Sequence, residues 1–194
     1  MRLFALLFLA TAVATGSFAA DEHRELGVHE HGRGTLNIAV EGNKVTMELE
    51  VPGVDLVGFE HAAKTRRDKS AVEKAKTQLM APLGLFALPA SAACRVTEAK
   101  VEIGEHDHDT KREPKAAAGA EAEKGAAKSE GHSEFHAQYA LECAAPGNMT
   151  AIEFGYFRTF AGAQKLDVNV ITPKGQSKFE VTRSNPNLSL AGMI

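Results

Sequence analysis

Apolar and polar residues alternate along most of the chain, and this period of two predicts a protein built mainly of strands. The turn Glu41-Gly42-Asn43 joins the first two alternating segments, so we expect these to form a hairpin. Pro173-Lys174-Gly175 turns the chain between the last two segments. The alternating segments are 35–40, 44–51, 95–103, 134–143, 151–154, 165–172 and 178–182.

A single clear helical period lies between the predicted strands, over Asp68 to Met80. Ser70 and Glu73 have the spacing of a capping box near its start. The apolar face expected for this helix consists of Val72, Ala75, Leu79 and Met80. Strands and helix together predict the α+β class: a β-rich antiparallel sheet or a two-layer sandwich with one or two helices.

The first 19 residues have the character of a signal peptide. Arg2 supplies a positive charge, residues 3–13 form a short apolar stretch, and small residues around Ala19 suit cleavage. The apolar stretch is too short to span a bilayer, and no second one follows it. We therefore expect an exported, periplasmic protein with no membrane span in the mature chain, residues 20–194.

Composition changes sharply over residues 104–131, which contain no Val, Ile, Leu, Met or aromatic residue. Such a segment has too little apolar surface to offset the entropy lost on ordering. We predict a flexible acidic and His-containing insertion within one metal-binding domain.

The chain contains two cysteines, Cys94 and Cys143, and in an exported protein they predict one disulfide bond. A two-cysteine metal site is less favoured, because an oxidising compartment removes the thiolates. In its strand, Cys143 shares the parity of the apolar residues, whereas Cys94 shares that of Glu98 and Lys100. Pairing the two cysteines therefore requires a bulge, or a strand that begins after Cys94.

Charge and composition argue against several classes of function. The formal net charge of −3 is too mild to indicate a nucleic-acid partner. Trp is absent and only two Tyr are present, so a stacking platform for bases or sugars is not expected. Neither a His-Glu-x-x-His nor a Gly-x-Ser-x-Gly motif occurs, which argues against a hydrolytic metalloenzyme or a serine hydrolase.

Histidines in short-range sets carry the main chemical signal, because neutral imidazole is a common ligand of divalent metals. His29 and His31 are two residues apart, so on an extended chain they project to one face. Glu60 is either a ligand or the carboxylate that orients His61. The candidate metal ligands are His29, His31, Glu60, His61, His106, His108, His132 and His136.

Pairing of the two cysteines on antiparallel neighbours would place residue 105 roughly opposite His132. His106, His108 and His132 would then meet where the insertion leaves and re-enters the sheet. Solvated or core histidines explain several of these residues as well as metal binding does. His61 lies in an apolar turn, and His136 lies on the polar face of its strand.

Four stretches of the sequence resemble the ZrgA-type family of zinc-regulated periplasmic proteins. They are His29–Gly32 with Leu36–Gly42, Val51–His61, Ala93-Cys94, and His132–Cys143. Members of this family are produced under zinc limitation and are linked to zinc binding and uptake. The resemblance implies that the metal is zinc, which the spacing of the histidines alone does not show.

We therefore expect a non-enzymatic periplasmic zinc-binding protein that supports zinc acquisition or delivery. A divalent metal ion is its expected partner, and a zinc ABC transporter or the binding protein of that transporter is a candidate recipient. Two alternatives remain open. One is a protein that binds copper(II) or nickel(II), which accept similar ligands. The other is a structural or partner-binding envelope protein in which the histidines are incidental.

Overall fold

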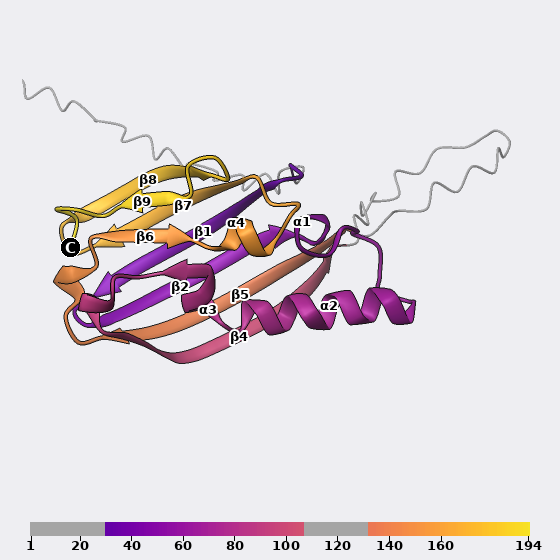
Figure 1. Cartoon of the computed structure of the whole chain (residues 1–194), viewed down its shortest axis with the longest axis horizontal. Coiled ribbons are helices and arrows are strands. Elements are labelled where there is room, and N and C mark those ends of the chain that lie inside the picture. The colour runs from indigo at the N-terminus through magenta and orange to yellow at the C-terminus, as the bar shows by residue number, and fades with distance from the viewer. Residues whose placement is uncertain (1–29, 107–131) are drawn as a thin grey trace, which may run out of the picture.

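A six-stranded sheet forms the main layer of the protein (Figure 1). The computed structural model describes residues 30–106 and 132–194, so the expected signal peptide and most of the expected insertion lie outside the described residues. The strand order is β4-β5-β2-β1-β7-β8. These strands are β1 (Arg33–Glu41), β2 (Lys44–Pro52), β4 (Cys94–His106), β5 (His132–Cys143), β7 (Lys165–Thr172) and β8 (Gly175–Thr182).

The predicted α+β class is confirmed, but the sheet is mixed rather than purely antiparallel. Neighbouring strands run antiparallel except for β1 and β7, which run parallel, with Arg33 opposite Lys165. A parallel pair needs a crossover connection, and here the chain between β5 and β7 crosses one face of the sheet before β7 begins. β1 and β7 each also pair with the strand that follows in sequence, and these pairs, β1–β2 and β7–β8, are the two predicted hairpins.

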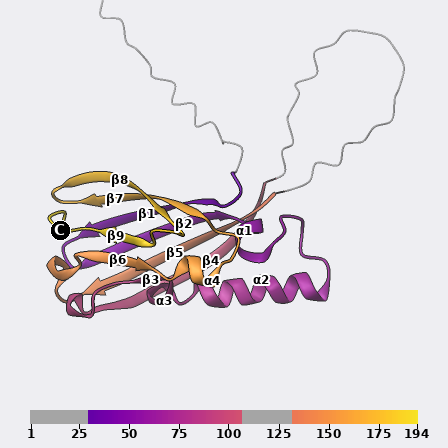
Figure 2. The same cartoon turned by 45° about the horizontal axis from the view of Figure 1, so that its top comes forward.

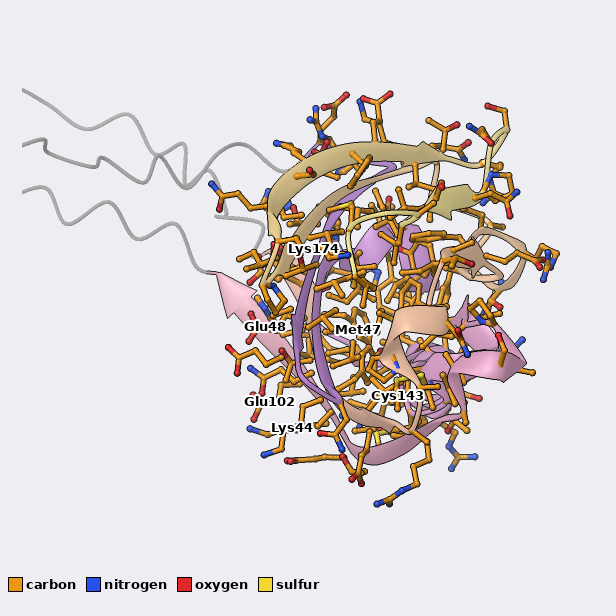
Figure 3. All side chains as sticks on the ribbon, turned by 90° about the vertical axis from the view of Figure 1, so that its left-hand side faces the viewer. Lys44, Met47, Glu48, Glu102, Cys143 and Lys174 are labelled. Atoms are coloured by element: carbon orange, nitrogen blue, oxygen red, sulfur yellow. A yellow bond between two sulfur atoms is a disulfide. The ribbon has the colours of Figure 1, made fainter. Side chains whose placement is uncertain are left out.

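The alternation of the sequence corresponds to the two faces of this sheet. The predicted apolar residues of β2 and β5 are buried: Val45, Met47, Leu49, Val51, Phe135, Ala137, Tyr139 and Leu141. Met47 and Cys143 point into the interior, whereas Lys44, Glu48 and Glu102 point away from it (Figure 3). A sheet with one packed and one solvated face produces this pattern in the sequence.

A second layer covers the packed face of the sheet (Figure 2). It contains a small three-stranded sheet and three short or medium helices. Its strands are β3 (Phe86–Ala87), β6 (Ala151–Phe154) and β9 (Asn187–Ser189), in the order β3-β6-β9. Its helices are α2 (Arg66–Leu79), α3 (Pro82–Leu85) and α4 (Tyr156–Thr159). Phe86 packs against Tyr139 of β5, so aromatic rings join the two layers.

The predicted disulfide bond between Cys94 and Cys143 is confirmed, and of the two alternatives for their parity, a bulge or a strand that begins after Cys94, the structure has the bulge. The register of β4 against β5 shifts between Val96 and Glu98, which restores the parity of Cys94 with the buried face. The same shift brings His106, rather than residue 105, opposite His132. The disulfide closes the end of the β4–β5 pair opposite to these histidines.

Helix α2 begins two residues earlier than the sequence pattern suggested. Thr65 is its N-cap, and Thr65 and Asp68 form a reciprocal capping box, so the expected box at Ser70 is wrong. Ala75 and Leu79 are buried as predicted, but Met80 is 49% exposed because it is the C-cap residue and lies beyond the packed face. No helix within residues 30–106 and 132–194 is long and apolar enough to cross a membrane.

The corrected cap can be tested with two single substitutions. Thr65→Ala removes the acceptor for the Asp68 amide and should lower the free energy of unfolding by about 1 kcal/mol. Ser70→Ala is the control: Ser70 is an exposed residue inside the helix, where Ala is the better helix former, so stability should stay equal or rise by a few tenths of a kcal/mol. Urea unfolding of both variants measures this, and a larger loss for Ser70→Ala would contradict the assignment.

Candidate metal site

Several of the predicted ligands come together at one end of the large sheet. Register places the start of β1, the end of β2, the start of β5 and the end of β4 at this end. His132 opens β5 opposite His106, and Pro52 at the end of β2 lies opposite Glu134. His31 lies two residues before β1. Strand pairing therefore brings together residues that are about 100 positions apart in sequence.

Glu60 lies between two histidines at this end of the sheet. Its Oε2 is in close contact with Nδ1 of His132, and its Oε1 lies 3.1 Å from Nε2 of His31. Oε1 has no hydrogen-bond partner within the described ranges, so the approach of His31 is an electrostatic contact without hydrogen-bond geometry. We call His31, Glu60 and His132 the Glu60 site.

The short helix α1 (Gly53–Val57) positions Glu60. It follows β2 directly and ends at Gly58, whose φ of 84° reverses the chain so that Glu60 turns back toward the sheet. The Ser133 amide then donates to the Glu60 carbonyl at 3.1 Å, which joins this segment to β5 beside His132. Gly53 permits the close approach, because a Cβ there would lie 2.2 Å from the Ser133 Oγ.

His31 is positioned by the backbone of the next residue, Gly32. The φ of Gly32 is 84°, a value that favours glycine, and its amide donates to Asp55 Oδ1 at 2.7 Å. The Gly32 carbonyl accepts from the amides of Gln164 and Lys165, each at 2.8 Å. The turn that carries His31 is therefore held from α1 and from the start of β7.

Asp55 was not among the residues that the sequence analysis selected. It lies in the apolar stretch between β2 and Glu60 and is only 4% exposed. Burial raises its pKa to about 6, although the hydrogen bond from Gly32 and the proximity of His31 act in the opposite direction. Its contact with Gly32 joins residues 23 positions apart, and neither hydrophobic periodicity nor motif spacing predicts a contact of this kind.

His61 faces away from the Glu60 site. Its ring stacks on Phe59 with centroids 4.6 Å apart, and its Nδ1 lies 3.1 Å from the Ala62 carbonyl. It also lines a groove of about 390 Å³ together with Phe59, Ala63, Val72, Ile103, Ser133 and Phe135. Glu60 thus contacts His31 and His132, whereas the ring of His61 lies against Phe59 in the groove that Val72 of α2 also lines.

His136 lies in a second carboxylate environment on the solvated face of the sheet. Its Nε2 is 3.1 Å from Glu134 Oε2, and its Nδ1 is 3.8 Å from Glu50 Oε1. Register places it opposite Glu50 on β2 and Glu102 on β4. His136 is four residues along β5 from His132, and these contacts involve Glu134 and Glu50 rather than Glu60.

The remaining predicted ligands fall outside the described residues. His29 and His108 lie beyond them, and only the backbone of His106 is described. Within residues 30–106 and 132–194, no group of three or more His, Cys, Asp or Glu side chains is arranged so that it could hold a metal ion as it stands. The Glu60 site instead presents a carboxylate shared by two imidazoles.

The Glu60 site has a donor set that zinc accepts, two imidazole nitrogens and one carboxylate. The 3.1 Å between His31 Nε2 and Glu60 Oε1 is close to the separation of two ligands on one tetrahedral zinc ion. That separation is about 3.3 Å for bonds of about 2.0–2.1 Å. These two atoms are therefore close enough to share one ion, and coordination by all three side chains would require them to rearrange.

The raised pKa of Asp55 predicts a pH dependence of stability. Because the pKa is about 6 in the folded protein and ordinarily 3.8, the folded protein binds the proton more tightly than the unfolded chain. Stability from this group is full below the ordinary value and is lost as pH rises through 6. In zinc-free protein, lowering the pH should therefore stabilise the wild type relative to Asp55→Asn by about 1 to 3 kcal/mol.

Urea unfolding of the two proteins across this pH range measures the difference between them. Effects of other titrating groups are common to both proteins and cancel in that difference. A difference that does not change with pH would contradict the assignment.

A comparison with models of protein families shows to which family most of the chain is related. A family model described as the ZrgA family zinc uptake protein matches residues 28–190, which include both described sheets and the Glu60 site. No curated protein matches the chain in sequence. The match confirms the resemblance found in the sequence, and the chain belongs to the ZrgA family of zinc uptake proteins.

Proposed function

We propose that this protein is an exported, periplasmic zinc-binding protein that supports zinc acquisition or delivery without catalysing a reaction. Membership of a zinc uptake family supports the choice of metal. The observation that carries the proposal is the placement of the Glu60 carboxylate between the rings of His31 and His132. In this proposal these three side chains bind the zinc ion as cargo.

The exposure of the site suits a protein that must take up and release its metal. The side chains of His31 and His132 are 64% and 43% exposed, whereas that of Glu60 is 13% exposed. Glu60 thus provides a fixed, partly covered negative charge, and the two imidazoles are accessible from solvent. Three protein ligands leave one coordination position open, through which a recipient protein can supply a ligand during transfer.

Ligand chemistry alone does not separate zinc from its neighbours in the transition series. Imidazole and carboxylate ligands also suit copper(II) and nickel(II), and copper(II) binds more tightly to most sites. The family assignment favours zinc, so copper(II) and nickel(II) belong in the test as competing ions. The remaining alternative is a structural or partner-binding envelope protein with incidental histidines, and it predicts no tight binding of any of the three ions.

The proposal predicts the outcome of a zinc titration of the mature protein against a chromogenic chelator at neutral pH. His31→Ala, Glu60→Ala and His132→Ala should each weaken zinc binding at this site by about tenfold or more. His61→Ala is the matched control, because His61 is adjacent to Glu60 in sequence but directs its ring toward Phe59. This control should change the affinity by less than about twofold.

Isothermal calorimetry with wild-type protein gives the stoichiometry, and parallel titrations with copper(II) and nickel(II) give the selectivity. Equal affinity of the wild type and the three site variants would refute the Glu60 site. No zinc binding by the wild type would refute the proposed function. Recovery of the protein in the periplasmic fraction, with an intact mass matching cleavage after Ala19, tests the proposed location.

A further inference from the structure

We propose that Asp55 is the positioning residue of the metal site: its carboxylate holds the Gly32 amide and thereby holds His31 against Glu60. This inference rests on the proposed function and adds to it a residue that does not touch the metal. Asp55 is two residues into α1, on the segment that also carries Glu60, whereas Gly32 is adjacent to His31. A single hydrogen bond of 2.7 Å thus ties one ligand-bearing segment to the other.

The turn around Gly32 depends on this contact from one side. Its carbonyl is held by Gln164 and Lys165, but its amide has Asp55 as acceptor. Arg33 gives the turn two further attachments: its amide and side chain donate to Glu30, and its side chain donates to Asp167 on β7. The bond to Asp55 is therefore the contact that directs the turn toward α1 and Glu60.

The surroundings of Asp55 allow little movement. Gly162 packs against its backbone so closely that a Cβ there would lie 2.7 Å from the Asp55 carbonyl oxygen. The second carboxylate oxygen, Oδ2, is buried and has no hydrogen-bond partner within residues 30–106 and 132–194. A buried carboxylate with one satisfied oxygen costs stability, and a hydrophobic residue of similar size would avoid that cost. A role in positioning His31 gives a physical reason for a carboxylate at this position.

His132 is held in a different way, which makes the inference specific. The Ser133 amide donates to the Glu60 carbonyl, so His132 is attached to the Glu60 segment through the backbone and not through Asp55. Loss of the Asp55 side chain should therefore disturb His31 and leave His132 in place. A general loosening of the fold would affect both histidines.

The test is a double-mutant cycle on zinc affinity in the mature protein. Asp55→Ala should weaken zinc binding by about tenfold, a typical effect of removing a group that orients a metal ligand. In the His31→Ala background the same change should have little further effect, whereas in the His132→Ala background it should retain its full effect. Asp55→Asn keeps an oxygen acceptor for the Gly32 amide and should restore most of the affinity.

Thr172→Val is the matched control for loss of a buried hydrogen bond. Thr172 is buried at the opposite end of β7, where its hydroxyl donates to the Met193 carbonyl at 2.8 Å. This variant should lower the melting temperature without changing zinc affinity. If Asp55→Ala lowers affinity equally in the His31→Ala background, or if Asp55→Asn is as weak as Asp55→Ala, the positioning role is overturned.

A measurement without metal separates this inference from the proposed function. In zinc-free protein, imidazole ¹⁵N and ¹H resonances of His31 should shift in Asp55→Ala and return in Asp55→Asn, while those of His132 stay unchanged. Unchanged His31 resonances would overturn the inference even if zinc binds as proposed. Absence of zinc binding by the wild type would refute the proposed function, and the resonances would still decide the role of Asp55.

Discussion

Burial of one face of the six-stranded sheet is the constraint on which the rest of the structure depends. Side chains alternate across a strand, so a slip of one residue would move the whole apolar set of β2 or β5 into solvent. The pairings of β2 with β5 and of β5 with β4 are therefore fixed by the core. Fixed register in turn places His132 beside the end of β2, from which α1 and Glu60 follow. The geometry of the Glu60 site thus depends on the packing of the buried face of the sheet.

The alternation of apolar and polar residues predicted the features of the fold that this alternation determines. The main strands and the face that each buries follow from alternation. The disulfide was predicted from the two cysteines of an expected exported chain, and their parity left a bulge or a later strand start, of which the structure has the bulge near Thr97. Contacts that depend on side-chain hydrogen bonds were harder to predict from the sequence. Ser70 and Glu73 had suitable spacing for a cap, but Thr65 and Asp68 have the same spacing nearer the N-terminus, and Thr65 has the extended backbone of an N-cap residue. The parallel pairing of β1 with β7 depends on the path of a distant connection, which local pattern does not report.

Among the site residues, the sequence identified candidate donors but not their grouping. His31, Glu60 and His132 were selected for their chemistry, and Glu60 was considered as a partner of its neighbour His61. In the structure, the left-handed turn at Gly58 and the stacking of His61 on Phe59 direct the two adjacent side chains to different sides. Asp55 escaped selection because a lone carboxylate in an apolar stretch has no distinctive spacing. Its role depends on a tertiary contact with Gly32.

The Glu60 site combines rigid backbone with accessible ligands, and this combination bears on how a cargo metal is handled. Gly32, Gly53 and Gly58 each adopt a conformation or approach that a larger residue would disturb, so the segments that carry the donors are closely fitted. The two imidazoles at the ends of these segments remain partly exposed, and they contact a carboxylate that is mostly covered. If zinc binds there as proposed, it would displace the contacts of Glu60 with the imidazoles, and breaking these contacts would offset part of the binding free energy. That competition would lower the affinity below that of a site with unengaged ligands, and it would give the carboxylate and the imidazoles a stable arrangement to return to when the metal leaves.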